Sequence, residues 1–129
     1  MLRAVLEGIC YHLRWMLECQ QKKVKIPQTI RFVGGGALSA VTCQMLSDIT
    51  GRTVETVENT KDVGAIGAAM LAAVGSGEIK DLTQAGQLVH VSGRYTPDAA
   101  NRAVYERNYT VFKRLYASNQ KNFAPLNRQ

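Results

Sequence analysis

The stretch TIRFVGGGALS, residues 29–39, decides the fold. Residues 29–33 are mostly β-branched and apolar and lie between Pro27 and Gly34, which predicts a short buried strand. Three consecutive glycines follow, and then apolar residues recur at helical spacing: Leu38, Val41, Met45, Leu46 and Ile49. Strand, glycine turn and helix form half of an α/β unit, and Gly51 stands where a left-handed cap would end the helix.

Periodic patterns extend this unit on both sides. A preceding helix of about five turns is predicted by apolar residues three and four positions apart: Leu2, Val5, Leu6, Ile9, Leu13, Met16 and Leu17. Alternation over residues 52–57 predicts a second strand, and a further helix is expected from about Asp62 to Val74, closed by Gly75. Asp81 and Gln84 predict a capped short helix around Leu82.

The C-terminal part of the chain predicts one more helix. Thr96 and Pro97 have the residue types of an N-cap and a first helical position. The helix carries an aromatic stripe typical of a core: Tyr105, Tyr109, Phe112 and Tyr116. Residues 122–129 lack periodicity, so we expect residues 1–121 to form the domain and residues 122–129 a flexible tail.

The helix expected from Asp62 to Val74 has very small side chains, because it is built largely of glycine and alanine. Each interior glycine costs about 1 kcal/mol relative to alanine. Such a backbone suits either tight packing of the helix on a sheet or the edge of a bound ligand.

The glycine turn is the candidate site. Gly34, Gly35, Gly36 and Ala37 follow the carboxyl end of a predicted strand, where open α/β sheets bind ligands. Without Cβ atoms, the backbone N–H groups can approach a nucleotide, and the N-terminus of the following helix would favour a phosphate. A plain tight turn is the alternative. The turn is neither a Walker loop, which needs Gly-Lys-Ser/Thr, nor a dinucleotide fingerprint, because Ser39 replaces the required glycine.

Four segments together resemble the C-terminal domain of FGGY carbohydrate kinases, within the actin, Hsp70 and sugar-kinase superfamily, and most of all xylulokinases. They are AVLEGI at residues 4–9, FVGGGALS at 32–39, LSDITGRTV at 46–54 and GAIGAA at 64–69. The resemblance implies an α/β fold, namely a truncated ribonuclease-H-like (actin-like ATPase) domain, helix-rich with a small sheet remnant. Two predicted strands are fewer than the five of the family's sheet.

The resemblance also implies a function. A carbohydrate kinase transfers the γ-phosphoryl group of Mg-ATP to a sugar hydroxyl, so ATP and Mg²⁺ are the expected cofactors, and nucleotide and sugar the expected partners. By position, Gly34, Gly35, Gly36 and Ala37 would line the adenosine and α-phosphate side, with Gly67 nearby. Ala40 falls where glycerol kinases have an asparagine near the nucleotide, which argues against that subfamily.

The catalytic machinery is not expected within this chain. The resemblance implies that the catalytic aspartate, the phosphate-gripping hairpin and most sugar contacts belong to a preceding domain, and phosphoryl transfer needs all such groups to converge. Asp48, Asp62 and Asp81 lie on or beside predicted helix ends, where capping or solvent exposure is the ordinary explanation. We therefore expect no catalytic residue and no metal ligand here, a chain inactive alone, and a metal held mainly by other parts of a longer protein.

Composition narrows the class of protein. The net charge of +6 comes from dispersed basic residues without the interleaved aromatics of a nucleic-acid module. No apolar run is long enough to cross a membrane and no signal-peptide pattern is present, so a cytoplasmic protein is expected. The three cysteines match neither a zinc site nor a disulfide framework and are expected to be reduced.

One alternative from another class stays open. The chain could be a non-catalytic regulatory or assembly module in which the glycine turn only packs and the thin helix forms an interface. In the kinase interpretation, a sheet lacking strands leaves an apolar face uncovered. We therefore expect the chain alone to self-associate or to bind nucleotide weakly, and a longer parent protein to form a homo-oligomer.

Overall fold

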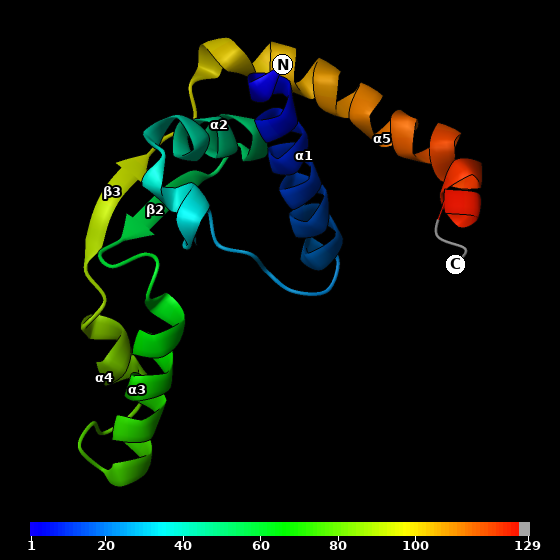
Figure 1. The fold of residues 1–129 in the computed structure, drawn as a ribbon. Helices are drawn as coiled ribbons and strands as arrows, with labels where there is room; N and C mark the ends of the chain where they lie inside the picture. Colours follow the sequence, from blue (N-terminus) through cyan, green and yellow to red (C-terminus); the bar gives the residue numbers. More distant parts are fainter. Residues whose placement is uncertain (127–129) are drawn as a thin grey trace.

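The computed structural model describes residues 1–126 and contains an α/β domain with helices on one face of a small sheet (Figure 1). The elements occur in the order α1 (Leu2–Gln21), β1 (Thr29–Arg31), η1 (Gly35–Leu38), α2 (Ala40–Thr50), β2 (Thr53–Val57), α3 (Val63–Ser76), α4 (Leu82–Gln87), β3 (Val91–Tyr95), η2 (Ala99–Asn101) and α5 (Arg102–Leu126). The helices expected from periodicity are all present. The helix-rich fold with a sheet remnant is confirmed.

The sheet has three strands in the order β1-β2-β3, not the two predicted. β1 and β2 run parallel, with Ile30 opposite Val54, whereas β3 pairs antiparallel with β2. The sequence of β3, VSGRY, lacks the alternation of apolar and polar residues that would predict a strand. Gly93 lies in its middle, and an extra residue interrupts its pairing with β2.

The core lies where α1, α2 and α5 meet over the sheet. Ile49 and Val54 are fully buried, and Tyr109 contributes the largest buried side chain. Three aromatic residues of the α5 stripe pack into the core as predicted, since the Tyr11 ring lies 6.3 Å from that of Tyr105, 6.0 Å from that of Tyr109 and 5.6 Å from that of Phe112. The prediction was wrong for Tyr116, which is 49% exposed and packs against Trp15 outside the core. Cys10 and Cys43 are buried in this core as free thiols, and Cys19 is exposed and also free.

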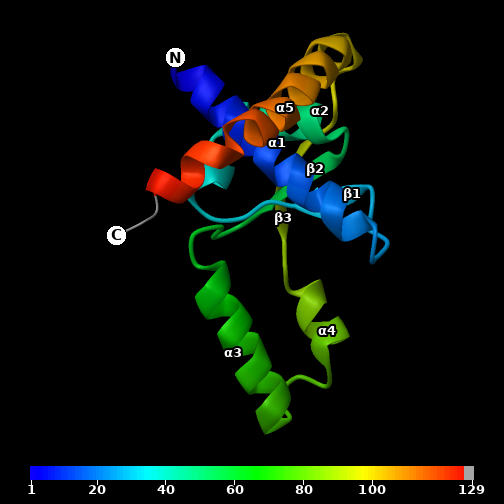
Figure 2. The same cartoon turned by 90° about the vertical axis from the view of Figure 1, so that its right-hand side faces the viewer.

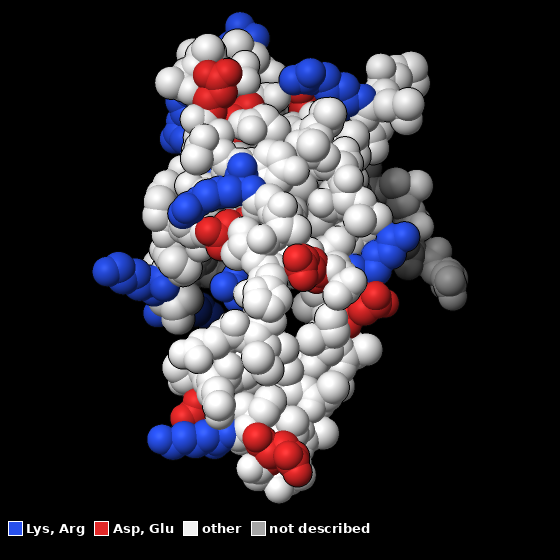
Figure 3. Space-filling view, turned by 90° about the vertical axis from the view of Figure 1, so that its left-hand side faces the viewer, with Lys and Arg blue, Asp and Glu red and all other residues white. Residues whose placement is uncertain are grey.

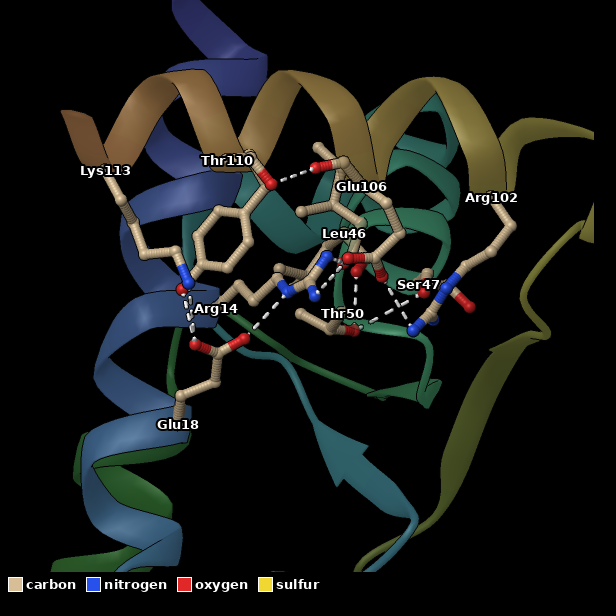
Figure 4. Close-up of polar contacts among 11 residues, drawn as sticks. Arg14, Glu18, Leu46, Ser47, Thr50, Arg102, Glu106, Thr110 and Lys113 are labelled. Carbon is tan, nitrogen blue, oxygen red and sulfur yellow. Dashed lines mark hydrogen bonds and ion pairs between the residues drawn. The ribbon is translucent and has the colours of Figure 1, made fainter. Parts of the chain in front are cut away.

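A charged network ties α5 to α1 and α2 (Figure 4). The Arg14 guanidinium donates to Glu18 at 3.1 Å, to the Ile49 carbonyl at 3.0 Å and to Glu106 at 2.8 Å. It also lies 4.1 Å from the centroid of the Tyr109 ring, and the Tyr109 hydroxyl donates to Glu18 at 2.8 Å. The network joins three helices through one largely buried cation.

This network predicts a measurable dependence of stability on pH. The hydrogen bond from Arg14 is the main reason that the pKa of Glu106 lies below its ordinary value. A lowered native pKa stabilises the fold above the ordinary carboxyl pKa, and this stabilisation is lost as pH falls through the native value. Urea unfolding of the wild type and of Glu106→Gln should therefore differ less at about pH 3 than at pH 6, by under about 1 kcal/mol because Glu106 is partly exposed. A constant difference across this range would contradict the assignment.

Several predicted boundaries were wrong. Gly75 lies inside α3, and Gly77, with φ of 83°, ends that helix. Thr96 does not cap the last helix; the Asp98 side chain caps η2, which leads into α5. Gly51 is the left-handed cap of α2 as predicted, with φ of 66°.

The chain ends also add detail. α5 continues to Leu126, so residues 122–126 of the expected tail are helical, and residues 127–129 lie outside the described part.

Some apolar residues of α1 are exposed, namely Leu2, Val5, Ile9 and Met16. Self-association through such a face stays a prediction. Among residues 1–126, no helix combines the length and the apolarity needed to cross a bilayer.

Candidate functional site

The loops that follow β1 and β2 lie at the same edge of the sheet, because the two strands are parallel. The first loop holds the glycine turn, and the second covers residues 58–62 and leads into α3. They are joined by Gly34, whose N–H lies 2.9 Å from the Thr60 carbonyl oxygen and 3.1 Å from Thr60 Oγ1. The φ of Gly34 is 88°, a conformation that side chains disfavour, so glycine is required for this junction.

A cleft of about 490 Å³ opens between these loops, within the range of about 300–1,000 Å³ of small-molecule sites. Its lining comes from η1, from the end of β2 with the following loop, and from β3: Ala37, Leu38, Thr56, Val57, Glu58, Asn59, Thr60, Lys61, Asp62, Ser92 and Tyr95. Ala37, Thr56, Val57 and Thr60 are buried, whereas the charged residues Glu58, Lys61 and Asp62 are exposed. The cleft therefore has an uncharged inner part and a charged rim.

The predicted site residues have different places around this cleft. Ala37 lines it, and Gly34 holds its two loops together. Gly36 faces the Phe32 ring, since a Cβ there would lie 2.9 Å from the ring, so this glycine allows close packing. A Cβ on Gly35 or Gly67 would meet no atom within 4 Å, which leaves open space at both positions.

The glycine turn is not followed directly by the long helix, contrary to the prediction. The glycines do not stand at the N-terminus of the long helix, because they form the separate turn η1 and α2 begins only at Ala40. The side chain of Ser39 already accepts a hydrogen bond from the Thr42 N–H at 3.3 Å. Residues 58–62 and β3 also line the cleft, although neither was predicted as part of the site. For residues 58–62 the available signal was their position directly after the second predicted strand.

α3 presents a nearly bare surface. It extends with α4 away from the other helices (Figures 1 and 2), and its visible face carries little charge except near the tip (Figure 3). None of its residues is buried, and a Cβ on Gly64 would also meet no atom within 4 Å. Tight packing of α3 on the sheet, one of the two expectations, is therefore not what the described residues show.

The aspartates also differ from expectation. Asp81 caps α4, accepting from the Gln84 N–H at 2.9 Å, as predicted. Asp62 occupies the N-cap of α3 without a side-chain cap bond. Asp48 is neither a cap nor exposed: it is buried inside α2 and accepts hydrogen bonds from Gln44, from the Asp98 N–H and from Asn101. Asp48 thus holds the connection between β3 and α5.

Comparison with known proteins gives the family. The family model for the C-terminal domain of the FGGY family of carbohydrate kinases matches residues 1–76 of the chain. The chain belongs to the FGGY family of carbohydrate kinases. This FGGY chain is 35% identical over 116 residues to a protein named xylulose kinase from Bacillus subtilis (strain 168), which covers 89% of the chain and 23% of that protein.

Two further matches agree. The xylulose kinase of Escherichia coli (strain K12) is 36% identical over 115 residues, covering 88% of the FGGY chain and 24% of that protein. The crystal structure of xylulose kinase from Rhodospirillum rubrum superposes with a TM-score of 0.79 at 31% identity, covering 95% of the chain and 25% of that structure. The FGGY chain therefore spans about a quarter of the length of these relatives and shares the sugar-kinase fold.

Proposed function

We propose that the cleft between η1 and residues 58–62 binds the nucleoside end of ATP in a kinase that phosphorylates a sugar hydroxyl, with a ketopentose such as xylulose as the substrate class. The chain contributes this half-site and is inactive alone. Family membership supports the reaction class, and the relatives named xylulose kinase support the substrate. The observation that carries the site is the cleft at the carboxyl edge of β1 and β2.

The chemistry of the lining suits a nucleoside better than a triphosphate. The buried part is formed by apolar groups and hydroxyls, and the rim carries one cation, Lys61, against two carboxylates, Glu58 and Asp62. A triphosphate needs concentrated positive charge or a metal ion. We therefore assign the phosphates to the open side of the cleft, beside Gly35, and their grip to other parts of a longer polypeptide.

The Mg²⁺ ion, like the grip on the phosphates, is assigned to other parts of a longer polypeptide. Among residues 1–126 no group of three or more His, Cys, Asp or Glu side chains is arranged to hold a metal ion. ATP-dependent kinases use Mg²⁺ to bridge the phosphate oxygens and neutralise their charge. We propose that this ion is held mainly outside the chain, as is the catalytic aspartate. A cytoplasmic location and a homo-oligomeric parent remain parts of this proposal.

Changing Gly35 to valine tests the site. The new side chain would enter the open space beside the cleft without meeting protein atoms, so the fold should persist while the nucleotide is excluded. A steric penalty of about 1–3 kcal/mol corresponds to an ATP affinity about 5- to 150-fold weaker. The measurement is calorimetric titration of ATP into the full-length polypeptide that carries this chain, with thermal melting as the folding check.

The matched control is Gly75→Val, which adds the same atoms to another open position, on α3. Its ATP affinity should equal that of the wild type. If Gly35→Val also binds ATP normally, the nucleotide site lies elsewhere. The assembly-module alternative would then stand, and the bare surface of α3 would be the feature in its favour.

A further inference from the structure

The lining of the cleft contains a pair of hydroxyl groups from two strands, one buried on Thr56 and one exposed on Ser92. Thr56 Oγ1 of β2 lies 3.1 Å from Ser92 Oγ of β3, and both residues line the cleft. Thr56 is only 5% exposed. In this pair one hydroxyl hydrogen is used internally, which leaves one O–H donor and free lone pairs for a ligand.

Two irregularities of β3 accommodate this pair. Thr56 is opposite Gly93 and Val57 is opposite Val91, so Ser92 is an extra residue in the ladder. A bulge of this kind re-aims a side chain and is common beside active sites. Here the bulge brings Ser92 Oγ to within 3.1 Å of Thr56 Oγ1, although the strand partner of Thr56 is Gly93.

Gly93 supplies the second irregularity. A Cβ at this position would lie 2.8 Å from Thr56 Oγ1. The glycine therefore leaves room for the threonine hydroxyl. An interior glycine weakens a strand, and close approach of a neighbouring group explains its presence.

Thr56 brings one hydroxyl of the pair into the part of the cleft that suits an uncharged group. The charged residues of the lining are all exposed on the rim, whereas Thr56 belongs to the buried part. Burying a phosphate away from water and countercharge is costly. Since a nucleotide is linear, with the phosphates at one end, the part that reaches Thr56 is the base.

We propose that the Thr56–Ser92 hydroxyl pair hydrogen-bonds the polar edge of a purine base and sets the base specificity of the site. The inference rests on the proposed nucleotide function. A purine carries a donor and an acceptor on adjacent atoms at positions 6 and 1. In adenine the 6-amino group is the donor and the ring nitrogen N1 is the acceptor. In the 6-oxo purines the 6-carbonyl is the acceptor and the ring N1–H is the donor. Because hydroxyl groups rotate, the pair can match either order, and the site accepts both kinds of purine.

The test compares three ligands that differ at the base edge. ATP, inosine triphosphate and purine riboside triphosphate, which lacks a 6-substituent, are titrated into the full 129-residue chain, with amide NMR shifts at Leu38, Asn59 and Ser92 as the readout. We expect ATP and inosine triphosphate to bind within about threefold of each other. Purine riboside triphosphate should bind about three- to tenfold more weakly, since one hydrogen bond is lost.

Thr56→Val should lower the affinity for ATP and inosine triphosphate to that of purine riboside triphosphate and leave the last unchanged. Thr56→Ser keeps the hydroxyl and should restore both affinities. If the valine variant folds poorly, Ser92→Ala at an exposed position tests the same hydroxyl pair, with the same expected affinities for the three triphosphates. Equal losses for all three ligands, or a strong preference for ATP that survives removal of the hydroxyls, would overturn the inference. Absence of any shift at the cleft with every nucleotide would instead overturn the proposed function.

Discussion

Replacement of Asp48 by alanine is expected to lower the free energy of unfolding by about 3 kcal/mol. The carboxylate is 4% exposed and accepts hydrogen bonds of 2.8 Å from Gln44, 2.8 Å from the Asp98 N–H and 2.9 Å from Asn101. Alanine would remove all three hydrogen bonds, and a hydrogen bond to a charged group contributes about 1.5–3 kcal/mol. The donors are part-buried and Gln44 keeps its bond to the Thr96 carbonyl, so the total stays well below the sum of three such bonds. Urea denaturation followed by circular dichroism measures the change.

The matched control is Asp62→Ala, which removes an exposed carboxylate that makes no cap bond. Its effect should stay within about 0.5 kcal/mol. Hydrogen exchange adds a local readout, because loss of Asp48 should increase exchange at the Asp98 N–H more than in the α1 interior. Equal stability of the two variants would show that the buried carboxylate does not hold the link between β3 and α5.

Replacement of Arg14 by leucine is the second large effect, again about 3 kcal/mol of unfolding free energy. The Arg14 side chain is 12% exposed and bridges Glu18 and Glu106, while bonding the Ile49 carbonyl at the end of α2. Leucine keeps the apolar stem but leaves that carbonyl and both carboxylates without their shared donor (Figure 4). The carboxylates are 37% and 39% exposed, so solvent holds the loss at the lower end of the range for broken buried pairs.

Arg3→Leu provides the control on the same helix. Arg3 also pairs with a glutamate four residues on, Glu7 at 2.9 Å, but its side chain is 70% exposed. Water screens an exposed ion pair, so this variant should unfold close to the wild type. Arg14→Lys should fall between, since an ammonium group cannot reproduce the planar fork of guanidinium donors. A loss for Arg14→Leu no larger than for Arg3→Leu would contradict the role of the network.

The contacts of Asp48 and its neighbour Ser47 also bear on the cleft. Ser47 Oγ lies 2.8 Å from the Arg52 carbonyl oxygen and 3.0 Å from the Tyr95 carbonyl oxygen, which share its one hydrogen, and the neighbouring Asp48 holds the residues that follow. Tyr95 lines the cleft. The buried polar residues of α2 therefore fix the end of β3, and with it one wall of the candidate site.

Much of this protein was determined by its sequence alone, because the information was local. Helical spacing predicted α1, α2 and α5, β-branched runs predicted β1 and β2, and Gly51 predicted the left-handed end of α2. The four FGGY-like segments indicated the family, which the family model confirms. These signals depend on residues within a few turns of one another in the chain.

The tertiary structure decided what depends on distant segments. β3 has no clear period and exists because it pairs with β2, Asp48 is buried because the β3–α5 link folds over α2, and Arg14 is shared by three helices. The cleft unites η1, residues 58–62 and β3, whereas the glycine pattern pointed to only the first of these. Burial and pairing between remote segments are set by packing, so only the folded chain shows which hydroxyls and carboxylates lie together.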